Sequence, residues 1–467
     1  MLLAGVVFAR RQKTTKSYFL ASHSVPWWAI AASIVATETS TITFISVPGI
    51  AWAKGGDFRF LQIVFGYVVA RLIIAAVFMP WYFRGELVTV YELLQTRFAP
   101  SVKALAATLF VVMRTIADGV RLLLTAYVVA ALTDHLGVTG AIIGLGVIMT
   151  IFTLTGGIEA IVWIEVVQLA IYIGGAIAAA VVLLGDVGFD HAMALGVANE
   201  KFRLFDFSFD LTKTYTFWSG LIGGTFLTLS THGTDQYMVQ RYLCTDRPRS
   251  AAKAVIASGL VVLVQFAFFL FIGVLLFAFY GSNAPVSAPD QVFPHFIANH
   301  LPTGLSGLVV AAILAAAMSS SLNALASTSI TDFYQPLFAP NRSQEHYMRV
   351  SHVITAVWGA VQIAAALFVI GKDRRIVDTV LSIASFTNGP ILGLFFLGTF
   401  TRRVRQAGAL AGVTTGIAVM MFVWARLNVS WQWYVLIGSA VTFVVGYVAS
   451  VMFERGVIVG EAREEIV

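Results

Sequence analysis

Apolar runs of about twenty residues or more recur along the whole chain, and they constrain its fold more than any other feature. Each run is long enough to cross the roughly 30 Å hydrocarbon core of a bilayer as a helix. Only 12% of the residues are charged, whereas soluble domains carry about 25%. The chain is therefore predicted to be an all-α polytopic membrane protein. Its predicted spans are 26–54, 58–82, 102–133, 138–156, 160–185, 214–240, 251–281, 302–337, 347–371, 376–400, 406–427 and 431–453.

The segments outside these spans are short. Met1–Ala9 is apolar but too short to cross a membrane, so residues 1–25 are interpreted as the remnant of a truncated N-terminal span and a cytoplasmic loop. Lysine and arginine lie mostly on one side of the alternating spans, which predicts a cytoplasmic C-terminus with 456–467 as its tail. Residues 186–213 form a predicted extracellular loop. Within it, FRLFDFSFD at 202–210 alternates apolar and polar residues, which indicates a short strand or a lid.

The composition and motifs also limit the class of function. One cysteine, Cys244, excludes a disulfide framework and any metal site built from several cysteines. No HExxH pattern or nucleophile elbow appears at membrane depth, so the chain is predicted not to be an enzyme. The net charge of +6 comes from basic residues in loops between spans, and it does not indicate a nucleic-acid partner.

Two spans carry polar interruptions. The first contains ATETSTITF at 36–44, followed by Pro48 and Gly49, and threonine side chains compete for backbone hydrogen bonds. Five spans later, 222–236 reads IGGTFLTLSTHGTDQ. Transporters built from inverted repeats place helix breaks of this kind at the membrane midplane. The spacing predicts a five-plus-five inverted repeat in which the first span of each half is broken. The alternative is two continuous polar helices that line a wet cavity.

The segment 311–334, AAILAAAMSSSLNALASTSITDFY, carries small hydroxyl residues inside an apolar helix. Ala316, Ser319 and Ser320 stand at i, i+3 and i+4 and therefore share one helix face. Hydroxyl and carbonyl oxygens are hard ligands that suit a small cation. The alternative is that these small residues only let neighbouring helices pack closely.

Four motifs resemble those of the sodium:solute symporter family, which includes bacterial sodium/galactose, sodium/proline and sodium/sialic-acid symporters. They stand in family order along nearly the whole chain: LASHSVPWW (20–28), GGIEAIVWIEVVQ (156–168), DQYMVQRYLCTDRPRSAAKA (235–254) and AAAMSSS to TDFY (315–334). The resemblance implies a leucine-transporter-like fold. The first inverted repeat would cover 26–185, the second 214–400, and two additional spans 401–455.

The resemblance also implies a sodium site between the first and eighth core spans. Three carbonyls and two hydroxyls would form it, and by residue-by-residue matching they belong to Ala36, Thr39, Ala316, Ser319 and Ser320. In relatives an aspartate in the fifth core span often relays or binds sodium. Here the motif WIE supplies Glu165, which is a possible ion relay or, alternatively, a carboxylate paired with a neighbouring basic residue.

Matching to the galactose relatives implies a possible substrate pocket at Thr43, Thr228, Thr231 and His232. Relatives commonly carry larger amide or aromatic groups at these positions, so their substrate does not transfer to this chain. His232 is either a hydrogen-bonded structural group or a titrating one.

Charged residues add to the predicted pocket. Glu38 lies at the first break, where it could bind a proton, an amine on the solute, or one of Arg71 and Arg121. RTIADGVRL at 114–122 places Arg114, Asp118 and Arg121 on one helix face. These three residues form either a structural ion-pair ladder or an anchor in which Arg121 binds an anion.

The sequence therefore predicts a sodium-coupled secondary active symporter in the plasma (cell inner) membrane. It would import a small polar organic solute by alternating access, and that solute could be a sugar, a sugar acid, an amino acid or another carboxylate. Sodium is the co-transported ion, and no obligate protein partner is implied. A proton-coupled transporter of the same fold, with Glu38, Glu165 or His232 as carrier, is the alternative. A substrate-gated sensor would need a signalling domain, which this sequence does not contain.

Overall fold

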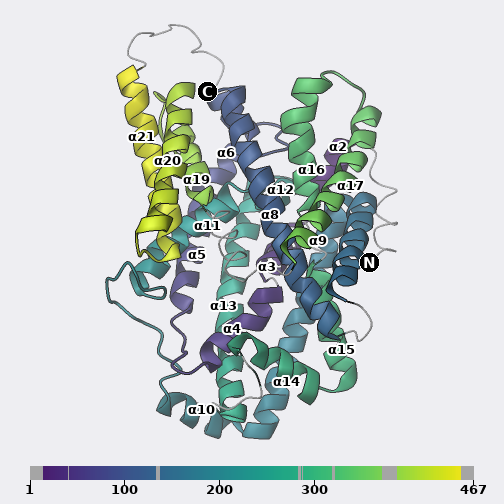
Figure 1. The fold of residues 1–467 in the computed structure, drawn as a ribbon, viewed down its shortest axis with the longest axis vertical. Coiled ribbons are helices and arrows are strands. Elements are labelled where there is room, and N and C mark those ends of the chain that lie inside the picture. The colour runs from purple at the N-terminus through teal and green to yellow at the C-terminus, as the bar shows by residue number, and fades with distance from the viewer. Residues whose placement is uncertain are drawn as a thin grey trace.

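A computed structural model describes residues 14–39, 41–132, 137–281, 286, 288–317, 321–370 and 386–453. All regular elements in these ranges are helices, and they form an elongated bundle (Figure 1). Most of the predicted N-terminal remnant and the whole predicted C-terminal tail lie outside the described residues.

The first half of the chain supplies helices on both sides of the first break. In chain order these are α2 (Thr15–Leu20), η1 (Ala21–His23), α3 (Trp27–Glu38), α4 (Thr41–Trp52), α5 (Leu61–Ile73), η2 (Ile74–Phe78), α6 (Met79–Tyr82), α7 (Glu92–Arg97), α8 (Pro100–Leu132), α9 (Val138–Val187) and α10 (Phe189–Ala198).

The second half of the chain supplies helices on both sides of the second break. Its elements are η3 (Ser219–Gly223), α11 (Gly224–Gly233), α12 (Gln236–Leu243), α13 (Pro248–Tyr280), η4 (Pro289–Gln291), α14 (Val292–His300), α15 (Thr303–Ala317), α16 (Leu322–Thr328), η5 (Ser329–Phe338), α17 (Gln344–Val369), α19 (Asn388–Phe400), α20 (Gln406–Arg426), η6 (Trp431–Trp433) and α21 (Tyr434–Phe453).

Six continuous helices in the described ranges are long and apolar enough to cross a bilayer. They are Leu61–Tyr82, Val138–Val187, Pro248–Tyr280, Gln344–Val369, Gln406–Arg426 and Trp431–Met452. Most of the other predicted spans are broken or carry charge. The helix α8, for example, contains Lys103, Arg114, Asp118 and Arg121. These helices agree with the prediction of a polytopic membrane protein.

Two predicted spans, 138–156 and 160–185, belong to the single element α9. A straight helix of its 50 residues would be about 75 Å long, well over twice the thickness of the hydrocarbon core. Gly157 interrupts it with φ +53° and ψ −162°, a conformation that is open to glycine because it has no Cβ. The kink therefore falls between the two predicted spans.

Both predicted helix breaks are present. The helix α3 ends at Glu38 and α4 begins at Thr41, so the first span is interrupted within 36–44. The helix α11 ends at Gly233, and Asp235 caps the start of α12 by accepting a hydrogen bond from the Tyr237 N–H. The broken-helix interpretation is therefore confirmed, and the alternative of two continuous helices is wrong.

The long helix α13 runs through the middle of the bundle and packs against α3, α4, α5 and α9 (Figure 1). Glycine permits the closest of these approaches. A Cβ on Gly273 would lie 2.2 Å from the carbonyl oxygen of Pro48. The break in the first span is thus held against a central helix.

The predicted strand at 202–210 is wrong. Residues 203–210 have no regular secondary structure, and no strand lies among the described residues for them to pair with. Their backbone groups bond elsewhere, because Asp206 N–H donates to the Gln62 side chain and its carbonyl accepts from the Phe217 N–H. The alternation of apolar and polar residues instead separates two sides of an extended loop segment.

Lys201, just after α10, caps the end of α4. Only 1% of this lysine is exposed, and its ammonium donates to the carbonyls of Ala51, Trp52 and Ala53 at 2.9, 3.1 and 2.7 Å. The last carbonyls of a helix lack partners within the helix, and a positive charge there complements the helix dipole. The ammonium also lies 4.2 Å from the centre of the Phe277 ring. The loop after α10 thereby fixes the outer half of the first span.

We predict that Lys201→Met lowers the free energy of unfolding by about 2 kcal/mol, because three buried carbonyls lose their donor. Lys201→Arg should lose less, since it keeps the charge. Lys213→Met is the matched control, because the Lys213 side chain in the same loop is 52% exposed. Thermal unfolding in detergent checks this, and equal shifts in the Lys201→Met and Lys213→Met variants would contradict the capping role.

Candidate functional site

Side chains from neighbouring helices satisfy the polar groups at the first break. The Thr39 N–H still donates to the carbonyl of Val35 at 2.8 Å, which closes the end of α3. The Gln265 amide of α13 donates to Thr39 Oγ1 at 2.8 Å, and Thr43 Oγ1 donates across the break to the carbonyl of Glu38 at 3.3 Å. The bilayer offers no water for such groups, so these contacts allow the helix to be broken.

Glu38 is held by two basic side chains at this break. The Arg71 guanidinium of α5 donates to Glu38 Oε2, and His232 Nε2 of α11 lies 3.7 Å from the same oxygen. Arg71 is buried. The ion pair therefore joins α3 to α5, and Arg71 Nη2, 3.1 Å from His232 Nε2, connects α5 to α11. Of the possible partners of Glu38 that the sequence left open, Arg71 is the one that the structure provides.

The hydrogen bonds of His232 define its protonation. Arg71 Nη2 lies 3.1 Å from Nε2, and arginine can only donate, so Nε2 accepts. The Nδ1 atom lies 3.0 Å from Thr231 Oγ1, whose hydroxyl donates to the carbonyl of Leu227, so Nδ1 carries the proton. A proton on Nε2 would place two donors face to face. His232 in this arrangement is a neutral, hydrogen-bonded group.

Glu165 is paired with a basic residue, as the alternative interpretation of the sequence held. The Arg241 guanidinium of α12 donates to Glu165 Oε1 at 2.6 Å and to Oε2 at 3.3 Å. Hydroxyl groups of α3 complete the contact, because Ser33 donates to Oε2 and Thr37 donates to Oε1 at 3.1 Å. Both charged side chains are about 1% exposed. This ion pair connects α9, α12 and the inner half of the first span.

The charged face of α8 divides between two roles. Arg114 pairs with Asp118 at 3.1 Å, as a ladder along the helix predicts. Arg121 lies one turn further on, and Nη2 donates to the carbonyl of Thr37 at 3.4 Å, beside the first break. The ladder therefore accounts for Arg114 and Asp118, whereas the Arg121 guanidinium faces the break.

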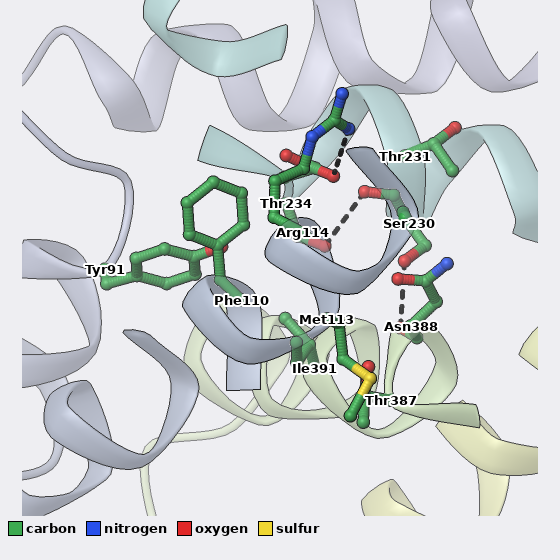
Figure 2. A pocket seen from close by; sticks show the side chains of 12 residues that line it. Tyr91, Phe110, Met113, Arg114, Ser230, Thr231, Thr234, Thr387, Asn388 and Ile391 are labelled. Carbon is green, nitrogen blue, oxygen red and sulfur yellow. Dashed lines mark hydrogen bonds and ion pairs between the residues drawn. The ribbon is translucent and has the colours of Figure 1, made fainter. Parts of the chain in front are cut away.

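A cavity of about 260 Å³ lies at the second break (Figure 2). Arg114 enters it from α8, with Nη1 4.0 Å from Asp235 Oδ2. Ser230 Oγ donates to the carbonyl of Asn388, at the start of α19, at 2.8 Å. The lining residues are Tyr91, Phe110, Met113, Arg114, Ala117, Ser230, Thr231, Thr234, Asp235, Thr387, Asn388 and Ile391. Polar and charged groups from α8, α11 and the start of α19 thus converge on this cavity, and convergent polar groups in a concave site can bind a small solute.

Three of the five predicted sodium ligands lie among the described residues. Ala36 and Thr39 lie at the end of α3, next to the break. Ala316 belongs to α15, which contacts α4, whereas Ser319 and Ser320 lie outside the described residues. The five predicted ligands therefore remain a prediction.

The predicted pocket residues fall into two groups. Thr43 and His232 lie at the first break with Glu38, whereas Thr231 also lines the cavity at the second break. Thr228 is buried one turn earlier on α11. The described part of the chain thus shows one polar region that extends from the first break to the second.

Sequence reasoning missed two residues at this site. Arg241 was quoted within a motif without being recognised as the partner of Glu165. Gln265 was not identified, although it is the lone amide in the apolar run LVVLVQFAFFL at 260–270. An amide in the middle of a membrane span was the available signal, because such a group needs a partner there.

The family model of the sodium:solute symporter family matches residues 18–416, which is most of the chain. The chain belongs to the sodium:solute symporter family. It is 32% identical to the sodium/sialic acid symporter NanT of Aliivibrio fischeri, over 97% of this chain and 91% of that protein. It is 30% identical to the sodium/sialic acid symporter SiaT of Proteus mirabilis, over 97% and 93%. Human sodium-coupled monocarboxylate transporter 2 is 28% identical over 90% of this chain and 69% of its own length.

Solved structures agree with this membership. A sodium-coupled sialic acid symporter in a substrate-bound outward-open state has a TM-score of 0.89 with 28% identity, over 97% of this chain and 95% of its own. The closed conformation of Mhp1, a nucleobase-cation-symport-1 family transporter, has a TM-score of 0.61 at 15% identity, over 92% and 94%, which shows a shared fold. The predicted fold class is confirmed.

The family also confirms the predicted class of function. The chain is a sodium-coupled secondary active symporter of a multi-pass membrane type, and it transports rather than catalyses. Alternating access in such proteins requires an element that differs between two states and that the ligands bias. The broken spans carry the Glu38–Arg71 ion pair and part of the cavity wall.

We predict that Arg71→Met destabilises the protein by about 3–5 kcal/mol, because it leaves Glu38 charged and poorly paired in a buried site. The double variant Arg71→Met/Glu38→Gln should be more stable than Arg71→Met alone, since it removes both charges. Thermal unfolding of the wild type, both single variants and the double variant measures this coupling. Strictly additive effects would contradict a direct ion pair.

Proposed function

We propose that this symporter imports a small carboxylate together with sodium. The two groups of curated relatives described above are named for sialic acid and for monocarboxylates, and both kinds of substrate carry a carboxylate. The observation that carries the proposal is the Arg121 guanidinium, which faces the first break and donates one long hydrogen bond to the Thr37 carbonyl. An arginine can bind a carboxylate through two parallel hydrogen bonds.

Arg121 suits this role better than the other arginines inside the spans. Arg71 is engaged by Glu38, and Arg114 by Asp118. In the part of the chain that the structure describes, no acidic side chain forms an ion pair with Arg121. A solute carboxylate would meet Arg121 beside the break, and we propose that the hydroxyl oxygens of Thr43, Thr228 and Thr231 contact its polar groups. The cavity at the second break would accept the solute as it leaves.

Sodium would bind between the first break and α15. The carbonyls of Ala36, Thr39 and Ala316 and the hydroxyls of Ser319 and Ser320 are the ligands that we propose. Hard oxygen ligands suit sodium and need no titratable group. Helix contacts support the arrangement, since α15 packs against both α9 and α4.

Proton coupling is less compatible with the charges in the site. The three candidate carriers named from the sequence, Glu38, Glu165 and His232, each have a guanidinium partner. Arg71 engages Glu38 and His232, and Arg241 engages Glu165. Protonating any of the three would disrupt a buried hydrogen-bonded contact, which is costly at low dielectric. Glu165 therefore positions α12 against α9 in our proposal, rather than relaying protons.

We also propose that the protein lies in the cell's inner membrane with a cytoplasmic C-terminus. The excess of lysine and arginine in alternate loops supports this orientation. On this basis α10 and α14 lie on the extracellular side, at the lower end of Figure 1, and α7 on the cytoplasmic side.

We predict that proteoliposomes at equal internal and external pH accumulate labelled sialic acid or lactate when an inward sodium gradient is imposed. Ser319→Ala and Ser320→Ala should each raise the sodium concentration for half-maximal uptake about tenfold, because each deletes one oxygen ligand. Ser306→Ala, on α15, is the control. Accumulation driven by a pH gradient in sodium-free buffer would reject sodium as the coupling ion. Unchanged sodium dependence in both serine variants would reject Ser319 and Ser320 as ligands.

We predict that the wild type discriminates a carboxylate from its neutral amide by roughly tenfold or more in competition for uptake, as expected for charge-assisted hydrogen bonds. Arg121→Gln should abolish this discrimination at saturating sodium, and Arg121→Lys should keep part of it because it retains the charge. Competition assays on the three proteins measure the ratio. If Arg121→Gln still prefers the carboxylate to the same degree, the anchor lies elsewhere, whatever the outcome for sodium.

A further inference from the structure

The loop between α10 and η3 contains a segment whose apolar residues face outward. In residues 203–211, which we call the aromatic strap, the exposed side chains alternate with less exposed ones. Phe205, Phe207, Phe209 and Leu211 are 44%, 61%, 70% and 43% exposed, whereas Asp206 and the other even-numbered residues are only partly exposed. A loop surrounded by water would show the reverse pattern, with polar residues outside.

Asp206, at the centre of the strap, turns toward the protein. Asp206 lies 3.7 Å from Arg59 and 3.9 Å from Lys213, and its backbone N–H donates to the Gln62 side chain at 3.0 Å. Hydrogen bonds from Ser208 lower the pKa of Asp206, so this carboxylate stays charged at neutral pH. These contacts fix which edge of the strap faces outward.

The outward rings are continuous with the surface of the spans. Trp218 Nε1, at the start of the second broken span, donates to the carbonyl of Phe207 at 3.2 Å. Tryptophan with one end hydrogen-bonded and one end apolar is enriched at membrane–water interfaces. Ring contacts join the strap to its neighbours at Phe205–Phe65, Phe207–Phe217 and Phe209–Trp433.

The strap is also tied to the outer ends of two other spans. Leu211 accepts a hydrogen bond from the Ser430 N–H at 2.8 Å, and the Gln432 amide donates to the carbonyl of Thr214 at 2.6 Å. Ser430 and Gln432 lie in the turn between α20 and α21. At the left of Figure 1 the loop runs from α10 along the outside of the bundle to the lower ends of α20 and α21. It therefore lies on the lateral surface at the level where these spans end.

We propose that the aromatic strap lies in the outer membrane–water interface, with Phe205, Phe207 and Phe209 inserted among the lipids. Lipid is the occupant that the observations favour, because the rings are continuous with spans that already face the bilayer. An amphipathic segment lies in the interface with its apolar side buried in the headgroup and acyl boundary. The strap would anchor the outer ends of α5, η3 and α21 to the membrane surface instead of closing over the solute path.

Site-directed spin labelling of the full chain in proteoliposomes tests this proposal. Cys244→Ser provides the background, since Cys244 is buried. Nitroxides are placed by Phe207→Cys and Phe209→Cys, with Lys213→Cys as the water control and Val264→Cys on α13, 70% exposed, as the lipid control. For each nitroxide, the measured quantity is its collision rate with oxygen divided by its collision rate with a water-soluble nickel complex. This ratio should be several-fold higher at positions 207 and 209 than at 213, and it should approach the value at 264.

Ser208→Cys is the matched neighbour, because its side chain turns toward the protein and should be less accessible to oxygen than position 207. A ratio at 207 and 209 equal to that at 213 would mean a water-exposed lid and would overturn the proposal. Low accessibility to both reagents at these positions would mean a protein cover, such as a second copy of the chain, and would overturn it too. Sodium-driven uptake by each labelled variant verifies that it is folded.

Discussion

A helix broken inside a bilayer exposes backbone groups that lipid cannot satisfy, and most of this structure depends on how that cost is offset. At the first break Thr43 donates to the Glu38 carbonyl and Arg121 donates to the Thr37 carbonyl, and at the second Asp235 caps the new helix start. Arg121 and Gln265, which donates to the Thr39 hydroxyl, lie on helices distant in sequence, so the first break depends on the assembled bundle. The breaks in turn place carbonyl and hydroxyl oxygens inside the bundle.

Buried ion pairs connect these broken spans to the rest of the molecule. Glu38–Arg71 joins α3 to α5, and Glu165–Arg241 joins α9 to α12. A buried ion pair contributes little net stability but strongly disfavours arrangements that separate its partners. Such contacts suit a transporter, because they make the alternative packings of the moving helices discrete. The same contacts engage the acidic groups and His232, which leaves cation binding to uncharged oxygens.

Charge and aromatic character are divided between the inside and the outside of the bundle. Guanidinium and carboxylate groups meet at the breaks, where low dielectric strengthens their attraction. Lys201, in the loop after α10, places its positive charge at the carbonyl end of α4. The aromatic strap lies on the opposite, lateral surface, where its polar residues bond to the protein and its rings face outward. The loop after α10 therefore contacts the first span and also contributes to the outer surface.

The sequence alone determined the all-α polytopic class, both breaks and the family, because hydropathy and small polar residues are local signals that tertiary packing rarely overrides in a membrane. It could not decide which charges pair. Glu38 had two candidate arginines, and only the packing of α5 against α11 brings Arg71 and His232 together. The alternation at 202–210 predicted a short strand or a lid, since period-two patterning does not say whether the outer side meets a sheet, water or lipid. Arg241 and Gln265 acquired roles only in three dimensions, because their partners lie 76 and 226 residues away.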